Sequence, residues 1–499
     1  MRYLLLFLFL LPTKNTTAQG FKRIYDLGMY TASFLSLDIR SDTINLIGFC
    51  RDTLPPYTLG ICFTQMDTFG TVLNQKCYFT DKDYWVGTYN QPFIRLKDDQ
   101  GYAIAGTFYG TNTGYLLCLN LEGNFLFVKE HTLPNSISFY WNEMYETDHG
   151  FVVAGNSERL GQSPDPFVLR LDKSGNWVDL VTFDGGRYEA MTGFTKINEN
   201  EFVLSTGSGT IPTSSPTSKT CSQFFGMDSL LNQTWFWESP LANDEVGGSS
   251  IQKTNNGDWL YTTQKVKYNP TIDDFQAQIR IVRRDPSFNL LWSKPYTGHY
   301  DNFNRLYDVQ PYPGGGYVGV GYIVPDGYQV GFSIRINESG DLLWERKDTA
   351  FYDTQLGADN IIGAVGFLPS GSIVACGTTV DWTIPQTLAW LLKFTPDGCI
   401  DTLNCKPISA LHEPPNRTPV LVNLAPNPAN DQITFSRKQL FDGLLEIWNT
   451  QGQLVHSVQW TGSQAVVQIS TQTFPSGLYY YTLTGANTLG SVGKFVVQH

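Results

Sequence analysis

The sequence contains little charge and no concentrated basic segment. Charged residues make up 16% of its 499 residues, and the formal net charge is −12. A surface that binds nucleic acid or anionic lipid needs lysines and arginines gathered on one face. We therefore exclude nucleic acids and anionic membranes as partners of this chain.

Several signatures of catalysis and of metal binding are also missing. No two of the six histidines have metal-ligand spacing, and the chain contains neither H-E-x-x-H, C-x-x-C nor the nucleophile elbow G-x-S-x-G. A formal G-x-G-x-x-G at Gly314, Gly316 and Gly319 opens an expected strand rather than a helix, so it does not indicate a dinucleotide site. The sequence predicts no cofactor, no metal and no catalytic residue that can be named.

The first residues carry an apolar run from Tyr3 to Leu11, which is too short to cross a bilayer. Arg2 precedes the run, and the small residues Thr17 and Ala18 follow it. This pattern is typical of a secretory signal peptide, residues 1–18. No cysteine follows the run, so a lipoprotein anchor is not indicated, and no later stretch predicts a transmembrane helix.

Export makes disulfides chemically accessible to the eight cysteines. Cys399 and Cys405 lie close enough in sequence to staple a short loop, and we predict this bond. Cys50 and Cys62 form a second candidate pair, facing each other across a hairpin. The remaining cysteines are predicted to be buried free thiols that pack as small hydrophobic residues: Cys77, Cys118, Cys221 and Cys376.

A single sequence pattern recurs along most of the chain: a polar turn, an apolar strand, a loop, a second apolar strand, a tight turn and a final strand. The clearest copies are residues 98–127 and 147–178. Weaker copies are residues 41–73, 198–235, 255–292, 313–344 and 369–400. The spacing of about 50 to 60 residues is within the range of propeller repeats.

Each copy is preceded by one more short strand, which gives about four strands per repeat. With 14% aromatic residues and 46 glycines, the composition also indicates an all-β protein. We predict a β-propeller over residues 19–406 with seven blades, six and eight being the alternatives. A solenoid is the competing architecture, but its repeats are usually shorter and it needs capping ends. Residues 21–28 are predicted to close the ring as the outer strand of the last blade.

The repeats lack the Gly-His and Trp-Asp signatures of WD40 blades. They resemble the degenerate propeller repeats of exported proteins from Gram-negative bacteria. Aromatic clusters at 83–89, 139–145 and 234–239 can stack on sugar rings or pack between blades, and Trp235 and Trp237 favour packing because they share one strand face.

Two functions remain open for this repeat domain. The first is a binding or adhesion module for a glycan or protein ligand. The alternative is a carbohydrate-active enzyme, a glycosidase or lyase, on the same scaffold. An enzyme should gather two or more carboxylates around the central channel or on one face.

A short proline-rich segment, residues 407–422, predicts a linker, after which the pattern changes. Residues 423–499 contain alternating strands, including a hairpin with a Gln-Gly turn, and predict a small β-sandwich. Pro426 and Pro428 cannot donate to a sheet ladder, so they are expected to hold the chain extended outside the strands.

Four ordered motifs occupy this C-terminal segment: L-A-P-N-P-A at 424–429, I-W-N-T-Q-G-Q-L-V at 447–455, P-S-G-L-Y at 475–479 and G-K-F-V-V at 493–497. In order and spacing they resemble the type A C-terminal sorting domain of type IX secretion, over residues 423–499. The resemblance implies export through the type IX translocon, removal by a sortase-type peptidase, and release or anchoring at the cell surface through lipopolysaccharide. The residues implied in recognition are Pro426, Asn427, Pro428, Gly477, Tyr479, Gly493 and Lys494.

Overall fold

The computed structural model describes residues 20–86, 92–159, 164–183, 187–209, 220–240, 245–246, 251–269, 274–297, 304–325, 327–350, 358–381, 386–400, 422–437, 442–449, 454–485 and 488–499. The chain divides into two compact units, residues 1–410 and residues 411–499. The predicted signal peptide and residues 407–421 of the predicted linker lie outside the described residues. Among the described residues, no helix has the length and hydropathy that spanning a bilayer requires.

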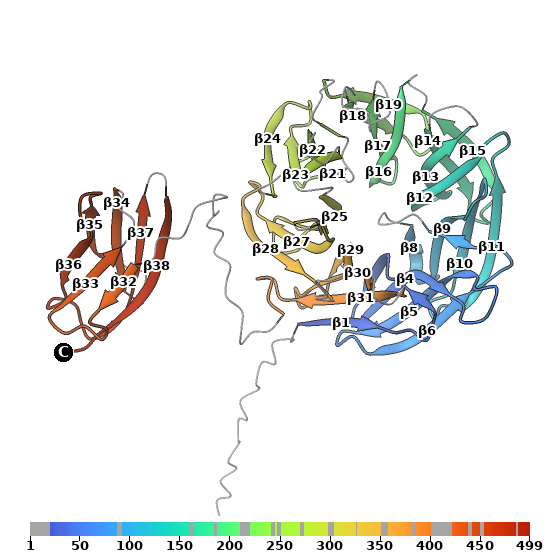
Figure 1. The fold of residues 1–499 in the computed structure, drawn as a ribbon. Coiled ribbons are helices and arrows are strands. Elements are labelled where there is room, and N and C mark those ends of the chain that lie inside the picture. The colour runs from blue at the N-terminus through green and yellow to red at the C-terminus, as the bar shows by residue number, and fades with distance from the viewer. Residues whose placement is uncertain are drawn as a thin grey trace, which may run out of the picture. The chain divides into compact units, whose positions relative to one another are not determined.

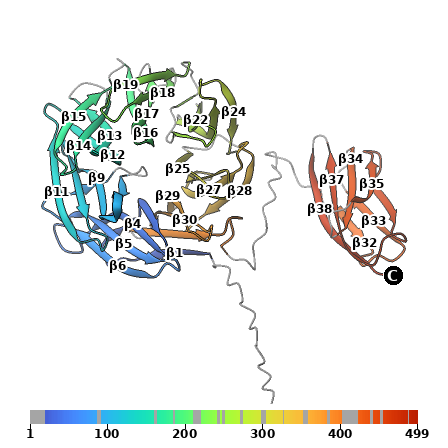
Figure 2. The same cartoon turned by 180° about the vertical axis from the view of Figure 1, so that it is seen from behind.

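The described residues of the first unit form seven antiparallel sheets of four or five strands. Figure 1 shows these sheets arranged as a ring, and Figure 2 shows the same ring from behind. Each sheet corresponds to one copy of the sequence repeat. The predicted all-β, propeller-like fold is therefore confirmed.

Sheet 1 contains β2 (Thr31–Ala32), β3 (Ser36–Arg40), β4 (Thr43–Arg51), β5 (Leu59–Asp67) and β6 (Val72–Tyr78). Sheet 2 contains β7 (Tyr84–Trp85), β8 (Phe93–Arg95), β9 (Tyr102–Phe108), β10 (Thr113–Leu119) and β11 (Phe125–Thr132), with the short 3-10 helix η1 (Lys97–Asp99) after β8. Sheet 3 contains β12 (Ser138–Thr147), β13 (Gly150–Glu158), β14 (Asp165–Asp172) and β15 (Trp177–Thr182). Sheet 4 contains β16 (Tyr188–Asn198), β17 (Glu201–Gly209), β18 (Thr220–Met227) and β19 (Gln233–Glu238).

Sheet 5 contains β20 (Glu245–Val246), β21 (Ile251–Lys253), β22 (Trp259–Asn269), β23 (Asp274–Arg284) and β24 (Leu290–Pro295). Sheet 6 contains β25 (Arg305–Pro311), β26 (Tyr317–Ile323), β27 (Val330–Ile336) and β28 (Leu342–Asp348). Sheet 7 contains β29 (Ala358–Phe367), β30 (Ile373–Asp381), β31 (Gln386–Phe394) and, from the start of the chain, β1 (Phe21–Tyr25).

A tight turn joins the outer two strands of a sheet and needs one residue in the left-handed region. Gly123 and Gly340 fill this place with φ of 72° and 76°, as their sequence motifs predict. In sheet 5 the same place is taken by Phe288, with φ of 63°. Its ring stacks on Trp259 of the same sheet and on Trp237 of sheet 4. Aromatic packing between two sheets thus offsets the strain of a non-glycine residue at this position.

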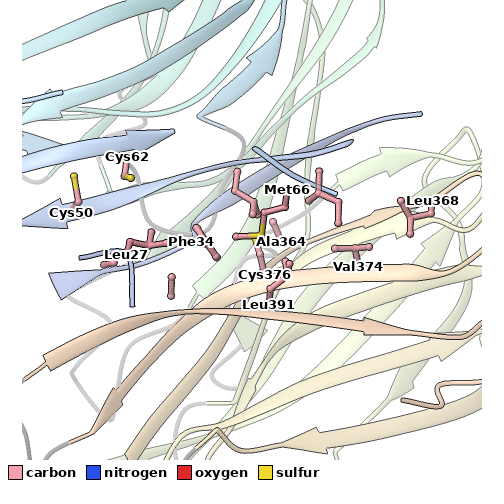
Figure 3. Close-up of a cluster of buried hydrophobic side chains, with 14 residues drawn as sticks. Leu27, Phe34, Cys50, Cys62, Met66, Ala364, Leu368, Val374, Cys376 and Leu391 are labelled. Carbon is pink, nitrogen blue, oxygen red and sulfur yellow. The ribbon is translucent and has the colours of Figure 1, made fainter. Parts of the chain in front are cut away.

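Apolar side chains fill the space between neighbouring sheets. Phe63 of sheet 1, for example, is fully buried and contacts Phe93 and Tyr102 of sheet 2. Figure 3 shows the corresponding cluster between sheets 7 and 1, in which Met66 packs with Leu391. Contacts of this kind hold the sheets together around the ring.

The ring closes through a strand from the beginning of the chain. β1 pairs in antiparallel register with β31, so that Phe21 lies opposite Lys393 and Tyr25 opposite Ala389. The predicted closing strand is confirmed. The pairing covers the edge of β31, which would otherwise present free backbone donors and acceptors.

Deletion of Phe21–Tyr25 is expected to lower the unfolding midpoint and to make the protein aggregate, because it exposes the edge of β31. Thermal unfolding and light scattering of the variant against the wild type measure both effects. Replacing the five residues by an alternating Val-Thr segment is the control and should recover most of the stability, since backbone pairing needs no specific side chains. Equal stability of the deletion variant would contradict this role for β1.

The second unit is a sandwich of two antiparallel sheets. One contains β32 (Val422–Ala425), β33 (Gln432–Arg437) and β36 (Val466–Ser470). The other contains β34 (Gly443–Asn449), β35 (Leu454–Trp460), β37 (Gly477–Gly485) and β38 (Thr488–Val497). Phe435 of the first sheet packs edge-on against Tyr481 and Phe495 of the second, within one buried core. The predicted β-sandwich and its β34–β35 hairpin are present.

The cysteines only partly follow the sequence predictions. Cys50 and Cys62 do not face each other, because the register of β4 and β5 places Cys50 opposite Gly60, and the partner of Cys62 is Cys77 in β6. Cys77 is free but only half-buried, whereas the other three cysteines predicted to be free are buried: Cys118, Cys221 and Cys376. Cys405 lies outside the described residues, so its bond to Cys399 stays a prediction.

Candidate functional site

The innermost strands of the ring enclose a cavity of about 570 Å³. Residues of β3, β12, β16, β21, β25 and β29 line it, so six of the seven sheets contribute. Three carboxylic acids are among them: Asp38, Glu143 and Asp308. The volume is in the range of small-molecule binding sites in proteins.

Glu143 and Asp308 occupy equivalent places in sheets 3 and 6. Each follows a β-bulge in the innermost strand of its sheet. Glu143 Oε2 accepts the backbone N–H of Phe194 at 2.9 Å, and Asp308 Oδ2 accepts that of Val365 at 3.0 Å. Both donors belong to the next sheet around the ring. The two carboxyl groups therefore connect neighbouring sheets along the cavity wall.

Burial changes the acidity of all three carboxyl groups. It raises the pKa of Asp308 to about 6 and that of Glu143 well above its usual value, with a further increase from the nearby charge of Asp308. Burial also raises the pKa of Asp38. The cavity thus contains acids that hold their protons more tightly than exposed carboxyl groups do.

The buried Asp308 is expected to make stability fall as pH rises from 4 to 6. An unfolded aspartate loses its proton near pH ~4, whereas folded Asp308 loses it at about 6. The folded state binds more protons in this interval, and folding is therefore weakened as the pH increases. Urea unfolding at several pH values should show a smaller fall for Asp308→Asn than for the wild type.

Asp172 is a matched control with the opposite sign. Hydrogen bonds from Asn176 lower the pKa of this residue at the end of β14, so its contribution to stability is lost as pH falls. Asp172→Asn is tolerable because Asn337 fills the same turn place in sheet 6. If Asp172→Asn and Asp308→Asn change the pH profile in the same direction, the assignment to Asp308 is wrong.

The other polar groups at the cavity are largely paired within the wall. Lys196 Nζ donates to the carbonyl oxygen of Glu146 at 2.9 Å and to Glu199 Oε1 at 2.6 Å. Gln310 Nε2 donates to Asp308 Oδ1 at 2.7 Å, so both oxygens of Asp308 accept a hydrogen bond.

Neither Asp38 nor Asp308 was singled out from the sequence, and Glu143 was included only because it lies in the aromatic cluster at 139–145. A signal for the acids at the bulges was nevertheless present. The equivalent bulge position in sheets 4 and 7 is taken by Gly193 and Ala364, so only some copies of the repeat place an acid there. The aromatic cluster itself divides, since Phe139 and Trp141 are buried between sheets whereas Tyr145 lines the cavity.

In the second unit, three of the four sequence motifs meet at one end of the sandwich. Asn427 Oδ1 accepts the backbone N–H of Val496 at 2.9 Å, and Ala429 forms a parallel bridge with Val497. Gly477 lies opposite Val497 in the register of β37 and β38. The loop containing Pro426 and Pro428 is therefore tied to the last strand.

Tyr479 is the buried centre of this end of the sandwich. Its ring stacks on Phe495, and its hydroxyl donates to the carbonyl oxygen of Pro475 at 2.8 Å. Gly493 and Lys494 directly precede Phe495 in β38 and lie opposite Tyr481 and Tyr480. Lys494 is exposed, whereas a side chain at Gly493 would collide with the ring of Tyr481.

Gly477 lies in a strand rather than in a turn. It is the first residue of β37, and it is not among the described residues with positive φ. A Cβ added there would meet almost nothing. Packing within the sandwich thus does not require glycine at 477.

Residues 423–498 match the family model of the secretion system C-terminal sorting domain. A sorting domain of this kind directs export to the outer cell surface or the medium and implies contact with the type IX machinery. The match covers the second unit and leaves the propeller unassigned.

No curated protein shows a significant match to the chain. Among solved structures, a puromycin hydrolase shares 11% identity at a TM-score of 0.47, and the match covers 82% of this chain but only 58% of the hydrolase. The periplasmic gluconolactonase of Pseudomonas aeruginosa shares 12% identity at a TM-score of 0.41, covering 63% and 86% of the two chains. The α-L-arabinanase of Penicillium chrysogenum shares 10% identity at a TM-score of 0.34, covering 75% and 97%. Similarity at this level carries no argument about activity.

Proposed function

We propose that the sorting domain carries the propeller through the type IX translocon and is then removed by a sortase-type peptidase. The single observation that supports this is the family match at residues 423–498. The released propeller then remains in the medium or is attached to lipopolysaccharide at the cell surface. The recognition residues proposed are Pro426, Asn427, Pro428, Gly477, Tyr479, Gly493 and Lys494.

Among these residues, Lys494 and Gly477 are the strongest candidates for contact with the machinery. Lys494 is exposed on β38, and glycine at 477 has no packing reason within the sandwich. Tyr479 and Gly493, in contrast, have internal roles, since one fills the core and the other makes room for Tyr481.

We infer that the exported propeller is a binding protein whose central cavity receives a small polar ligand, such as part of a glycan. The hydrogen bonding of the cavity acids supports this role over catalysis. Both oxygens of Asp308 and one of Glu143 already accept hydrogen bonds from the protein. These hydrogen bonds hold the carboxyl groups in the cavity wall, which favours a structural role over proton transfer.

Two observations favour the alternative, a carbohydrate-active enzyme. The first is that three carboxylic acids line the central cavity, Asp38, Glu143 and Asp308, as expected of an enzyme. The second concerns acidity, because glycosidases need a carboxyl group that stays protonated near neutral pH beside a second carboxylate. The raised pKa values of Glu143 and Asp308, which line the cavity from sheets 3 and 6, meet the first part of that requirement.

A panel of oligosaccharides incubated with the exported protein distinguishes the two functions. We expect bound ligand, detected by array or calorimetry, and no product by chromatography. The isosteric Glu143→Gln and Asp308→Asn variants should then change affinity only, and Asp179→Asn, on the exposed outer strand β15, should change nothing. Product formation by the wild type that is lost in Glu143→Gln would establish the enzyme instead.

A further inference from the structure

Three cysteines from neighbouring strands of sheet 1 place their sulfur atoms together. Cys50 lies in β4, Cys62 in β5 and Cys77 in β6, and their three Sγ atoms are all within 4.8 Å of one another. Cys62 and Cys77 are direct register partners, and Cys50 is diagonal to Cys62. None of the three is in a disulfide. We call this group the three-cysteine cluster.

The three-cysteine cluster lies at the edge of an apolar core. Cys50 and Cys62 are 0% and 1% exposed, and they belong to the buried cluster with Leu27 and Phe34 (Figure 3). Cys77 is half-buried on the outer strand β6 and packs against the same cluster. An ion held by the three sulfur atoms would therefore be largely shielded from water.

The sulfur atoms of the three-cysteine cluster lie in direct contact. Cys77 Sγ donates to Cys62 Sγ at 2.7 Å, and the side-chain amide of Gln75 donates to Cys77 Sγ at 3.9 Å. Cys50 supplies the third sulfur atom from the neighbouring strand β4. The fold thus gathers three sulfur donors in one place.

We propose that Cys50, Cys62 and Cys77 form a three-sulfur binding site for a soft monovalent cation, with Cu(I) as the ion that fits best. Thiolate sulfur selects Cu(I), zinc and iron–sulfur clusters over hard cations. Structural zinc takes four protein ligands, and the cluster contains no fourth His, Cys, Asp or Glu among the described residues. Cu(I) accepts three sulfur ligands.

The test is a competition titration of the reduced full-length protein with Cu(I) supplied as its bicinchoninate complex under anaerobic conditions. We expect one Cu(I) per chain and X-ray absorption that shows only sulfur in the first shell. Cys50→Ser, Cys62→Ser and Cys77→Ser should each weaken binding by at least the roughly 10- to 100-fold that loss of an outer-shell partner costs at metal sites.

Two matched controls separate this site from the other cysteines of the chain. Cys118→Ser changes a buried free cysteine of sheet 2, and the double variant Cys399→Ser/Cys405→Ser removes the predicted loop pair. Both variants should bind Cu(I) as the wild type does. Unfolding midpoints of all variants show whether a loss of binding comes from misfolding.

Three outcomes would overturn the proposal. The first is a wild-type protein that does not compete with bicinchoninate for Cu(I). The second is nitrogen or oxygen in the first shell of the bound ion, a result that needs no variant to fold. The third is a Cys62–Cys77 disulfide in the exported protein, found by peptide mass spectrometry without reduction.

Discussion

Deletion of residues 423–499 is expected to reduce the protein in the medium and at the cell surface to background, with the truncated chain retained in the periplasm. The deletion removes the whole sorting domain, and each buried core cluster of the described residues lies within one unit. The propeller should therefore still fold. Immunoblotting of the medium, cell surface and periplasm measures the distribution, and normal export of the truncated chain would refute the proposed route.

A pair of point variants on one strand tests recognition more finely. Lys494→Ala and Val496→Ala both change exposed side chains of β38 and should leave the sandwich folded. We expect Lys494→Ala to lower export and Val496→Ala to leave it unchanged. Equal export of the two variants would show that Lys494 is not read by the machinery.

Phe63→Ala is expected to destabilise the propeller by about 3–5 kcal/mol, the usual cost of removing a buried aromatic ring. Phe63 is fully buried, contacts Phe93 and Tyr102, and lies against Gly123 of the neighbouring sheet. Its loss creates a cavity between sheets 1 and 2. Urea unfolding of the exported protein, followed by tryptophan fluorescence, measures the change.

Phe125→Ala is the matched control, since Phe125 is 51% exposed on the outer strand β11. It should change stability by no more than about 0.5 kcal/mol. Similar losses in both variants would mean that packing between sheets does not dominate the stability of the ring.

Most of the fold could be predicted from the sequence, because the same strand and turn pattern occurs in several copies of the repeat. Turn residues such as Gly123 and Gly340 mark the same hairpin in several copies. Residues 21–28 were the segment left over to supply the outer strand of the last blade. Exceptions such as Phe288 cannot be predicted in this way, because part of the aromatic packing around its ring comes from Trp237 of a neighbouring sheet.

The functional groups were much harder to predict. Glu143 and Asp308 are three repeats apart in the sequence, and they line one cavity only because the sheets form a ring. Cys50, Cys62 and Cys77 have no metal-binding spacing, and strand register alone brings them together. The sorting motifs were predictable since they form a contiguous segment that resembles a known family.

The pairing of β1 with β31 determines when the ring can close during export. A chain that is threaded through a membrane channel from its N-terminus delivers Phe21 first and Lys393 almost last among the residues of the ring. β1 must wait without its partner while the intervening sheets form. A chain that ends before β31 leaves β1 without its partner, and it also lacks the sorting domain. Such a chain can therefore neither close the ring nor carry the signal for export.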